Sequence, residues 1–320
     1  MNSRNRSIDA LRGLSIVLMI FFTTTLILSK DLPYILRHNA RNSIHLGDFV
    51  LPLFLFSSGM SLSYYFNKHK DEDRITYFWG LGRRFIRLGI VAILLSPYSS
   101  RGFLEMDEIM LSALCFLGCV ILAKVDWRLL LGTIFVINTS YMVLIHNDWT
   151  DHFREYYLGG YLAALYYFPV MLSGVMIGDG MRKEEFLGTR NVRIICFIFI
   201  MFVYSMTFVD MRKMAATPPF MMASILLCFG SYGLIDILDK KVGSWGELEF
   251  LGKKPFRYWI MMYVVMIVPL KVMEDNSSLH LPLDLPWGVA ILISGALLVC
   301  LWLLSKLFDK YFSFRGIVFK

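Results

Sequence analysis

The sequence is poor in charge. Only 18% of its 320 residues are Asp, Glu, Lys or Arg, whereas 57% are hydrophobic. A soluble domain of this length carries more charge and fewer long apolar runs. The composition therefore excludes an ordinary soluble enzyme.

Several signals of other protein classes are also missing. The apolar run after Arg12 has no small-residue cleavage site behind it, so we expect a first helix rather than a removable signal peptide. No Gly-rich phosphate loop of the P-loop or dinucleotide type is present, so side chains would have to hold a nucleotide-like ligand. The lack of a convincing internal repeat weakens the interpretation as an inverted-repeat transporter.

Cysteine is scarce, and its distribution excludes a disulfide framework. The five cysteines all fall inside apolar runs, where we interpret them as small buried side chains: Cys115, Cys119, Cys196, Cys228 and Cys300. Metal ligation is not expected either. Cys115 and Cys119 share a helix face without enough further ligands, and His146 and His152 lack helical i, i+4 spacing.

The sequence does contain many apolar runs that match the roughly 20 residues of a membrane span. We expect spans near residues 9–29, 46–66, 83–98, 106–124, 128–145, 160–179, 192–209, 217–238, 254–272 and 286–307. The prediction is an all-α fold, a polytopic membrane bundle of about ten transmembrane helices. Little of the chain is left over, so residues 1–320 are expected to form one membrane-embedded domain in contact with lipid.

Basic residues predict the orientation of this bundle. With the N-terminus in the cytoplasm, twenty-three Lys and Arg residues flank spans on the inner side and eight on the outer side. Cytoplasmic loops carry the excess of Lys and Arg in membrane proteins. We therefore expect both termini to be cytoplasmic, and the net charge of +7 gives no reason to expect nucleic-acid binding.

Polar groups at two helix starts need an explanation, because charge near a bilayer is costly. Asp9 and Arg12 open the first span at i, i+3 and could simply pair with each other. Asp48 begins "DFVLPLFLF", close behind His38 and His45 in an outer loop. The helix dipole favours a carboxylate there but does not account for the histidines.

Basic clusters mark two predicted inner helix ends. "GRRFIR" contains Arg83 and Arg84, and "GKKPFR" contains Lys253 and Lys254. Such residues flank cytoplasmic helix ends in most membrane proteins, although a phosphate-rich ligand would also need them. Gly174 and Gly178 have the small-xxx-small spacing of close helix packing.

Two segments near the N-terminus are "RNRSIDALRGLSIVLMIFF" and "RHNARNSIHLGDFVLPLFLFSSGMSL", and the second contains His38, Asp48 and Pro52. They resemble the catalytic domain of heparan-α-glucosaminide N-acetyltransferases and their prokaryotic relatives, in which the histidine, aspartate and proline have the same spacing. The wider acyltransferase-3-like membrane enzymes are a related possibility. "KMAATPPFMMASILLCFG" and "LGKKPFRYWIMMY" are similar to later family elements. The chain departs from the family at Thr23 and Lys254, where asparagines are common.

The resemblance implies an enzyme that moves an acetyl group from cytosolic acetyl-CoA to an amine or hydroxyl of an extracytoplasmic acceptor. It puts the active histidine at His38, and we expect Asp48 to orient the imidazole or to fix the loop. His45 and Asn42 are candidates for binding a small-molecule or glycan acceptor. The candidates for the CoA phosphates are Arg12, Arg83, Arg84, Lys253 and Lys254. The expected location is the plasma membrane, with the His38 loop on the outer side. The sequence is compatible with a homodimer.

Two other classes of function are compatible with the same residues. A secondary transporter or flippase could line its path with Asp9, Arg12 and Asp48. A structural or assembly partner in the membrane would have no turnover. Binding of acetyl-CoA is expected only of the enzyme, so it distinguishes the enzyme from the transporter and from the assembly partner.

Overall fold

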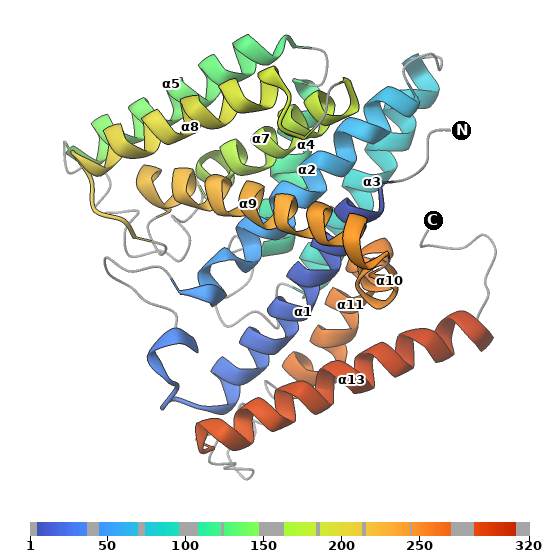
Figure 1. The fold of residues 1–320 in the computed structure, drawn as a ribbon. Coiled ribbons are helices and arrows are strands. Elements are labelled where there is room, and N and C mark those ends of the chain that lie inside the picture. The colour runs from blue at the N-terminus through green and yellow to red at the C-terminus, as the bar shows by residue number, and fades with distance from the viewer. Residues whose placement is uncertain are drawn as a thin grey trace.

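The structure is a computed structural model that describes residues 5–36, 45–69, 74–95, 108–122, 125–146, 163–183, 186–212, 216–243, 245–269 and 285–311. The described residues form helices and no strand, which confirms the predicted all-α class (Figure 1). The long helices are α1 (Arg6–Leu28), α2 (Val50–Lys68), α3 (Arg74–Leu95), α4 (Glu108–Ile121), α5 (Trp127–His146), α7 (Ala163–Lys183), α8 (Thr189–Met206), α9 (Pro218–Val242) and α13 (Trp287–Tyr311). Shorter elements are η1 (Tyr34–Leu36), η2 (Leu46–Phe49), α10 (Gly246–Lys253), α11 (Pro255–Met262) and the π-helix η5 (Tyr263–Ile267).

Local sequence explains several helix ends. Asn5 caps α1, because its side-chain oxygen accepts a hydrogen bond from the backbone N–H of Ile8 at 3.2 Å. α9 starts at Pro218, which suits a first turn where a backbone N–H has no helical partner. The same helix stops at Gly243, whose φ of 98° is strained for other residues.

Six helices of the described ranges are long and apolar enough to cross a membrane: residues 6–28, 46–68, 127–144, 189–206, 218–241 and 287–310. α4 and the α11–η5 segment are apolar but shorter. The number of about ten crossings therefore remains a prediction. The helices do coincide with the predicted runs, with α3 starting nine residues earlier than expected.

Glycines bring α2 and α7 into contact along their length. A Cβ atom at Gly59 would lie 2.1 Å from the carbonyl oxygen of Met171, and one at Gly174 would lie 2.2 Å from that of Phe56. At Gly178 a Cβ would meet the Ser63 hydroxyl at 2.4 Å. The predicted packing role of Gly174 and Gly178 is confirmed, and α2 is fixed in the middle of the bundle.

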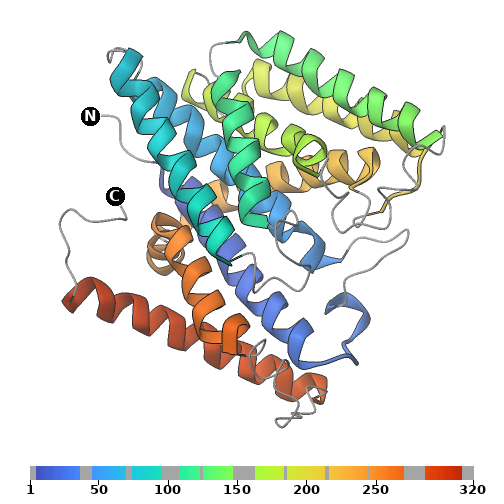
Figure 2. The ribbon, with the colours of Figure 1, turned by 180° about the vertical axis from the view of Figure 1, so that it is seen from behind.

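The predicted burial of two cysteines was wrong. Cys196 on α8 and Cys300 on α13 are exposed, although Cys115, Cys119 and Cys228 are buried as expected. α8 and α13 lie at the periphery, with α13 along one edge in both views, so their outer faces stay uncovered (Figures 1 and 2). The predicted span 254–272 coincides with α11 and η5, whereas α10, separated from α11 by a break at Lys254, was not predicted.

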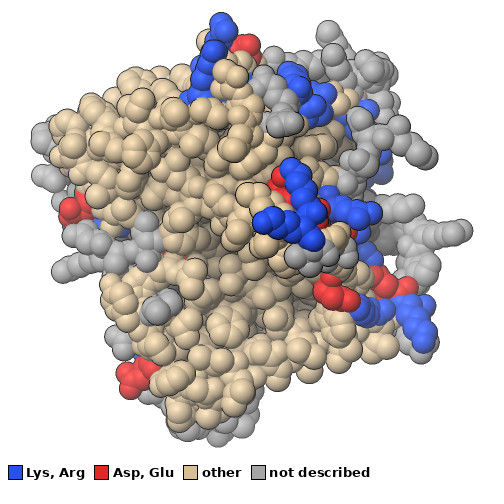
Figure 3. Space-filling view, viewed as in Figure 1, with Lys and Arg blue, Asp and Glu red and all other residues tan. Residues whose placement is uncertain are grey.

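Charged side chains are unevenly distributed over the surface. Lys and Arg gather on the right of the view, where α9, α10 and α13 end, and at its top, and wide areas elsewhere carry no charge (Figures 1 and 3). The described helices α2, α7, α9 and α13 all end in basic residues: Lys68, Arg182 and Lys183, Lys240 and Lys241, and Lys310. Basic residues therefore gather at these helix ends, and the orientation of the bundle in the membrane stays a prediction.

Candidate functional site

The described candidate residues of α1, α2 and α10 fall into two groups. Asp48 lies just before the start of α2, whereas Ser57 and Ser61 lie around the middle of α2, beside Arg12 near the start of α1. At 1.5 Å per residue, Asp48 and Ser57 are about 14 Å apart along the helix. We call the two groups the Asp48 end and the Arg12 end.

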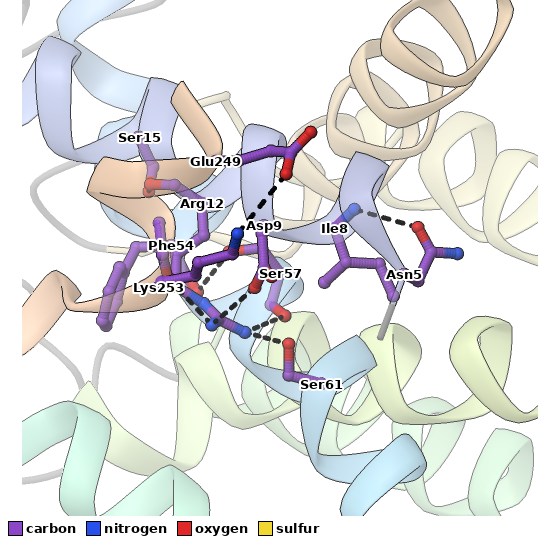
Figure 4. A network of polar contacts seen from close by, with 11 residues as sticks. Asn5, Ile8, Asp9, Arg12, Ser15, Phe54, Ser57, Ser61, Glu249 and Lys253 are labelled. Atoms are coloured by element: carbon purple, nitrogen blue, oxygen red, sulfur yellow. Dashed lines mark hydrogen bonds and ion pairs between the residues drawn. The ribbon is translucent and has the colours of Figure 1, made fainter. Parts of the chain in front are cut away.

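At the Arg12 end, one guanidinium joins three helices (Figure 4). Nη1 of Arg12 donates to the carbonyl oxygen of Gly252 on α10, at 3.2 Å. Nη2 donates to the carbonyl oxygen of Ser57 on α2 at 3.2 Å, and also to the hydroxyl of Ser61. These contacts connect α1 to α2 and to the last turn of α10.

The charge of Arg12 is balanced by Asp9 on the same helix. Arg12 Nη1 and Asp9 Oδ1 are 3.6 Å apart, and their side chains are only 10% and 3% exposed. An unpaired buried charge would cost several kcal/mol, so the pair accounts for both residues. The predicted pairing of Asp9 with Arg12 is confirmed.

The two lysines at the C-terminal end of α10 differ from Arg12 in exposure. Lys253 lies 3.5 Å from Glu249 with 45% of its side chain exposed. Lys254 and Arg257 both pair with Asp309 of α13. Glu247 of α10 also reaches α13, and hydrogen bonds from Lys306 and Trp302 hold its pKa below the usual range.

The remaining basic candidates are on α3. Arg83 is exposed, and its guanidinium lies 6.0 Å from the ring centre of Trp79 on the same helix. The side chain of Arg84 lies outside the described part of the structure. Arg12 and Lys253 thus belong to the same group of polar contacts around the end of α10, whereas the described contact of Arg83 is with Trp79 on its own helix.

At the Asp48 end, the carboxylate fixes the chain just before α2. Asp48 is fully buried, and its Oδ2 accepts a hydrogen bond from the backbone N–H of His45 at 2.9 Å. The His45 ring is buried against Tyr34, with 4.5 Å between ring centres. Of the two expected roles of Asp48, this contact corresponds to fixing the loop. His38 and Asn42 lie outside the described residues.

Comparison with known families agrees with the resemblance read from the sequence. The model of the heparan-alpha-glucosaminide N-acetyltransferase catalytic domain matches residues 4–198, more than half of the chain. The chain belongs to this family. It is therefore an integral membrane protein of an acetyltransferase family, as its apolar helices also indicate. No curated protein matched the chain.

The match with the heparan-alpha-glucosaminide N-acetyltransferase family includes Arg12, His38 and Asp48 but ends before α9. The family match therefore says nothing about Lys253 and Lys254, and their assignment as donor-binding candidates depends on their geometry in the structure. Within the described ranges, no group of three or more His, Cys, Asp or Glu side chains could hold a metal ion.

Sequence reasoning missed the partners of Arg12. Ser57 and Ser61 have the i, i+4 spacing of one helix face in an otherwise apolar run, which is a readable signal for a buried polar contact. Gly252 had no comparable signal, because α10 is far from α1 in the sequence and its packing on α1 depends on tertiary structure.

Proposed function

We propose that this chain is an acetyl-CoA-dependent membrane acyltransferase that delivers an acetyl group to an extracytoplasmic amine or hydroxyl, on a sugar or glycan. The observation that carries the proposal is the family match over residues 4–198, which contains both ends of the α1–α2 pair. Polar groups at each end of this pair suit an enzyme that takes its donor on one side and its acceptor on the other.

The chemistry requires a base near the acceptor. His38 would remove the proton of the acceptor N–H or O–H as its lone pair attacks the thioester carbonyl carbon, because a neutral imidazole accepts protons near pH 7. The C–S bond then breaks, and CoA leaves as the thiolate, which is protonated in water. A transient acetyl-His38 is the less favoured route. His45 and Asn42 would hold the acceptor.

The fixed carboxylate supports this assignment of the Asp48 end. Asp48 ties the backbone of His45 to the start of α2, so the last part of the histidine loop has a defined position. Catalytic groups need such support, since small displacements of a base cost rate.

Donor binding would use the cations that remain accessible. Lys253 keeps nearly half of its side chain exposed, and Lys254, Arg83 and Arg84 are the further candidates for the CoA phosphates. Lysine binds phosphate as a point charge, and arginine does so as a bidentate donor. The basic helix ends would face the cytoplasm, and both chain termini with them, in the plasma membrane.

The first test is binding of the donor. Acetyl-CoA at about 100 times its Kd should stabilise the purified protein by roughly 2.7 kcal/mol and raise its melting temperature. Acetate at the same concentration is the control ligand. If acetyl-CoA does not stabilise the protein, the enzyme hypothesis is contradicted. The transporter and the assembly partner are then the hypotheses that remain.

A second test concerns the base. His38→Ala should abolish acceptor-dependent release of CoA, because no other group is expected to take the acceptor proton. His69→Ala is the matched control, since His69 follows the other end of α2, against the Tyr65 ring, and its loss should leave turnover intact. Equal activity of the wild type and His38→Ala would contradict the assignment of His38 as the general base.

A further inference from the structure

We infer that Arg12 is a positioning residue: its guanidinium caps the C-terminal end of α10 and holds this helix on α1 and α2, and so sets where Lys253 stands. Arg12 on this account does not bind the donor's phosphates itself. The part of the inference that concerns Lys253 and the donor rests on the proposed function. The part that concerns α10 does not.

The contact between α1 and α10 is made by backbone. A Cβ on Gly252 would lie 1.7 Å from the carbonyl oxygen of Asp9, and a Cβ on Gly13 would lie 2.0 Å from that of Leu248. No side chain fits between the two helices at these points. Small shifts of α10 are therefore not absorbed by flexible side chains, and the polar contacts at its end define its register on α1.

Those polar contacts include a helix cap. The last four carbonyl groups of a helix lack helical partners, and α10 ends at Lys253. The Gly252 carbonyl is one of these four, and Arg12 Nη1 donates to it at 3.2 Å. A cation at this end also interacts favourably with the helix dipole.

The planar guanidinium can do this because its donors diverge. Nη1 faces Gly252 on α10, while Nη2 faces Ser57 and Ser61 on α2. A lysine at this position has one nitrogen on a flexible stem and cannot reproduce the fork. The sequence thus needs arginine here to join the three helices.

Burial argues against direct contact of Arg12 with the donor. Arg12 is 8% exposed and pairs with Asp9, whereas Lys253 immediately follows Gly252 and is 45% exposed on its side chain. The exposed cation is thus one residue beyond the carbonyl that Arg12 holds. Moving the end of α10 moves Lys253 with it.

The first experiment measures α10 without any donor. In Arg12→Lys, backbone amide hydrogen exchange over residues 246–253 should be about tenfold faster, the change expected from losing a charge-assisted hydrogen bond. Arg190→Lys is the control, since Arg190 of α8 pairs with Asp179 of α7 and should leave α10 unchanged. If Arg12→Lys does not fold, Ser61→Ala removes one acceptor and should give a smaller increase. Unchanged exchange in the folded variants would overturn the positioning role.

The second experiment separates positioning from direct binding. The Michaelis constant for acetyl-CoA is measured in Arg12→Lys, Lys253→Ala and the double variant, and each single change should raise it. If Arg12 acts through Lys253, the double variant should be no worse than Lys253→Ala. Additive effects would mean that Arg12 contacts the donor itself and would overturn the inference. A protein with no acetyl-CoA turnover would contradict the proposed function, while the exchange result for α10 would stand.

Discussion

Three buried ionisable side chains, Asp9, Arg12 and Asp48, each have a polar partner. Arg12 and Asp9 form an ion pair on the same helix. The Arg12 guanidinium donates to the carbonyl oxygens of Gly252 on α10 and Ser57 on α2. Asp48 accepts a hydrogen bond from the backbone N–H of His45. The sequence predicted that these charges have a structural or functional role, because a charge in an apolar run is costly. It could not predict which backbone groups they meet, since Gly252 and Ser57 come from distant parts of the chain.

At the residue scale, Asp48→Asn should lower the free energy of unfolding by about 1.5–3 kcal/mol, because a charge-assisted hydrogen bond to a buried N–H becomes a neutral one at best. Thermal unfolding in detergent would measure the loss. Asp31→Asn is the control, since Asp31 is exposed after the end of α1. Equal stability of the two variants would mean that the Asp48–His45 contact contributes nothing.

At the scale of elements, α10 is the main departure from the predicted helices. Its eight residues are too few and too polar to stand out from the hydropathy of the segments around them. Its position depends on glycine contacts with α1 and on ion pairs of α10 and α11 with α13. Hydropathy carries no information about such pairings. The glycine spacing of α7 did predict close helix packing, although not that α2 is the partner.

The glycine contacts give an element-scale prediction. Gly252→Ala should destabilise the protein by more than about 2 kcal/mol, because its Cβ would collide with a backbone oxygen that cannot move aside. Gly230→Ala on α9 meets open space and should be neutral or slightly stabilising, as alanine is the better helix former. Melting temperatures of the two variants test this, and a Gly252→Ala variant as stable as Gly230→Ala would contradict the backbone contact.

At the scale of the whole molecule, the sequence predicted an all-helical membrane protein and its family, and both were confirmed. The predicted burial of Cys196 and Cys300 was wrong, because an apolar run does not reveal whether its helix is central or peripheral. α8 and α13 expose broad apolar faces, among them Ile200 and Leu292, which suits contact with lipid. The orientation and the predicted site at His38 stay predictions.

In the proposed reaction an acetyl group passes from a donor on the inner face to an acceptor on the outer face. The most direct measurement uses sealed vesicles with the protein in known orientation, acetyl-labelled acetyl-CoA on the cytoplasmic face and an amino sugar on the other. We predict labelled acetyl sugar only on the face opposite the donor, with equimolar free CoA on the donor face and neither product in His38→Ala. Transport of the sugar without acetylation, or acetylation only on the donor face, would contradict the account.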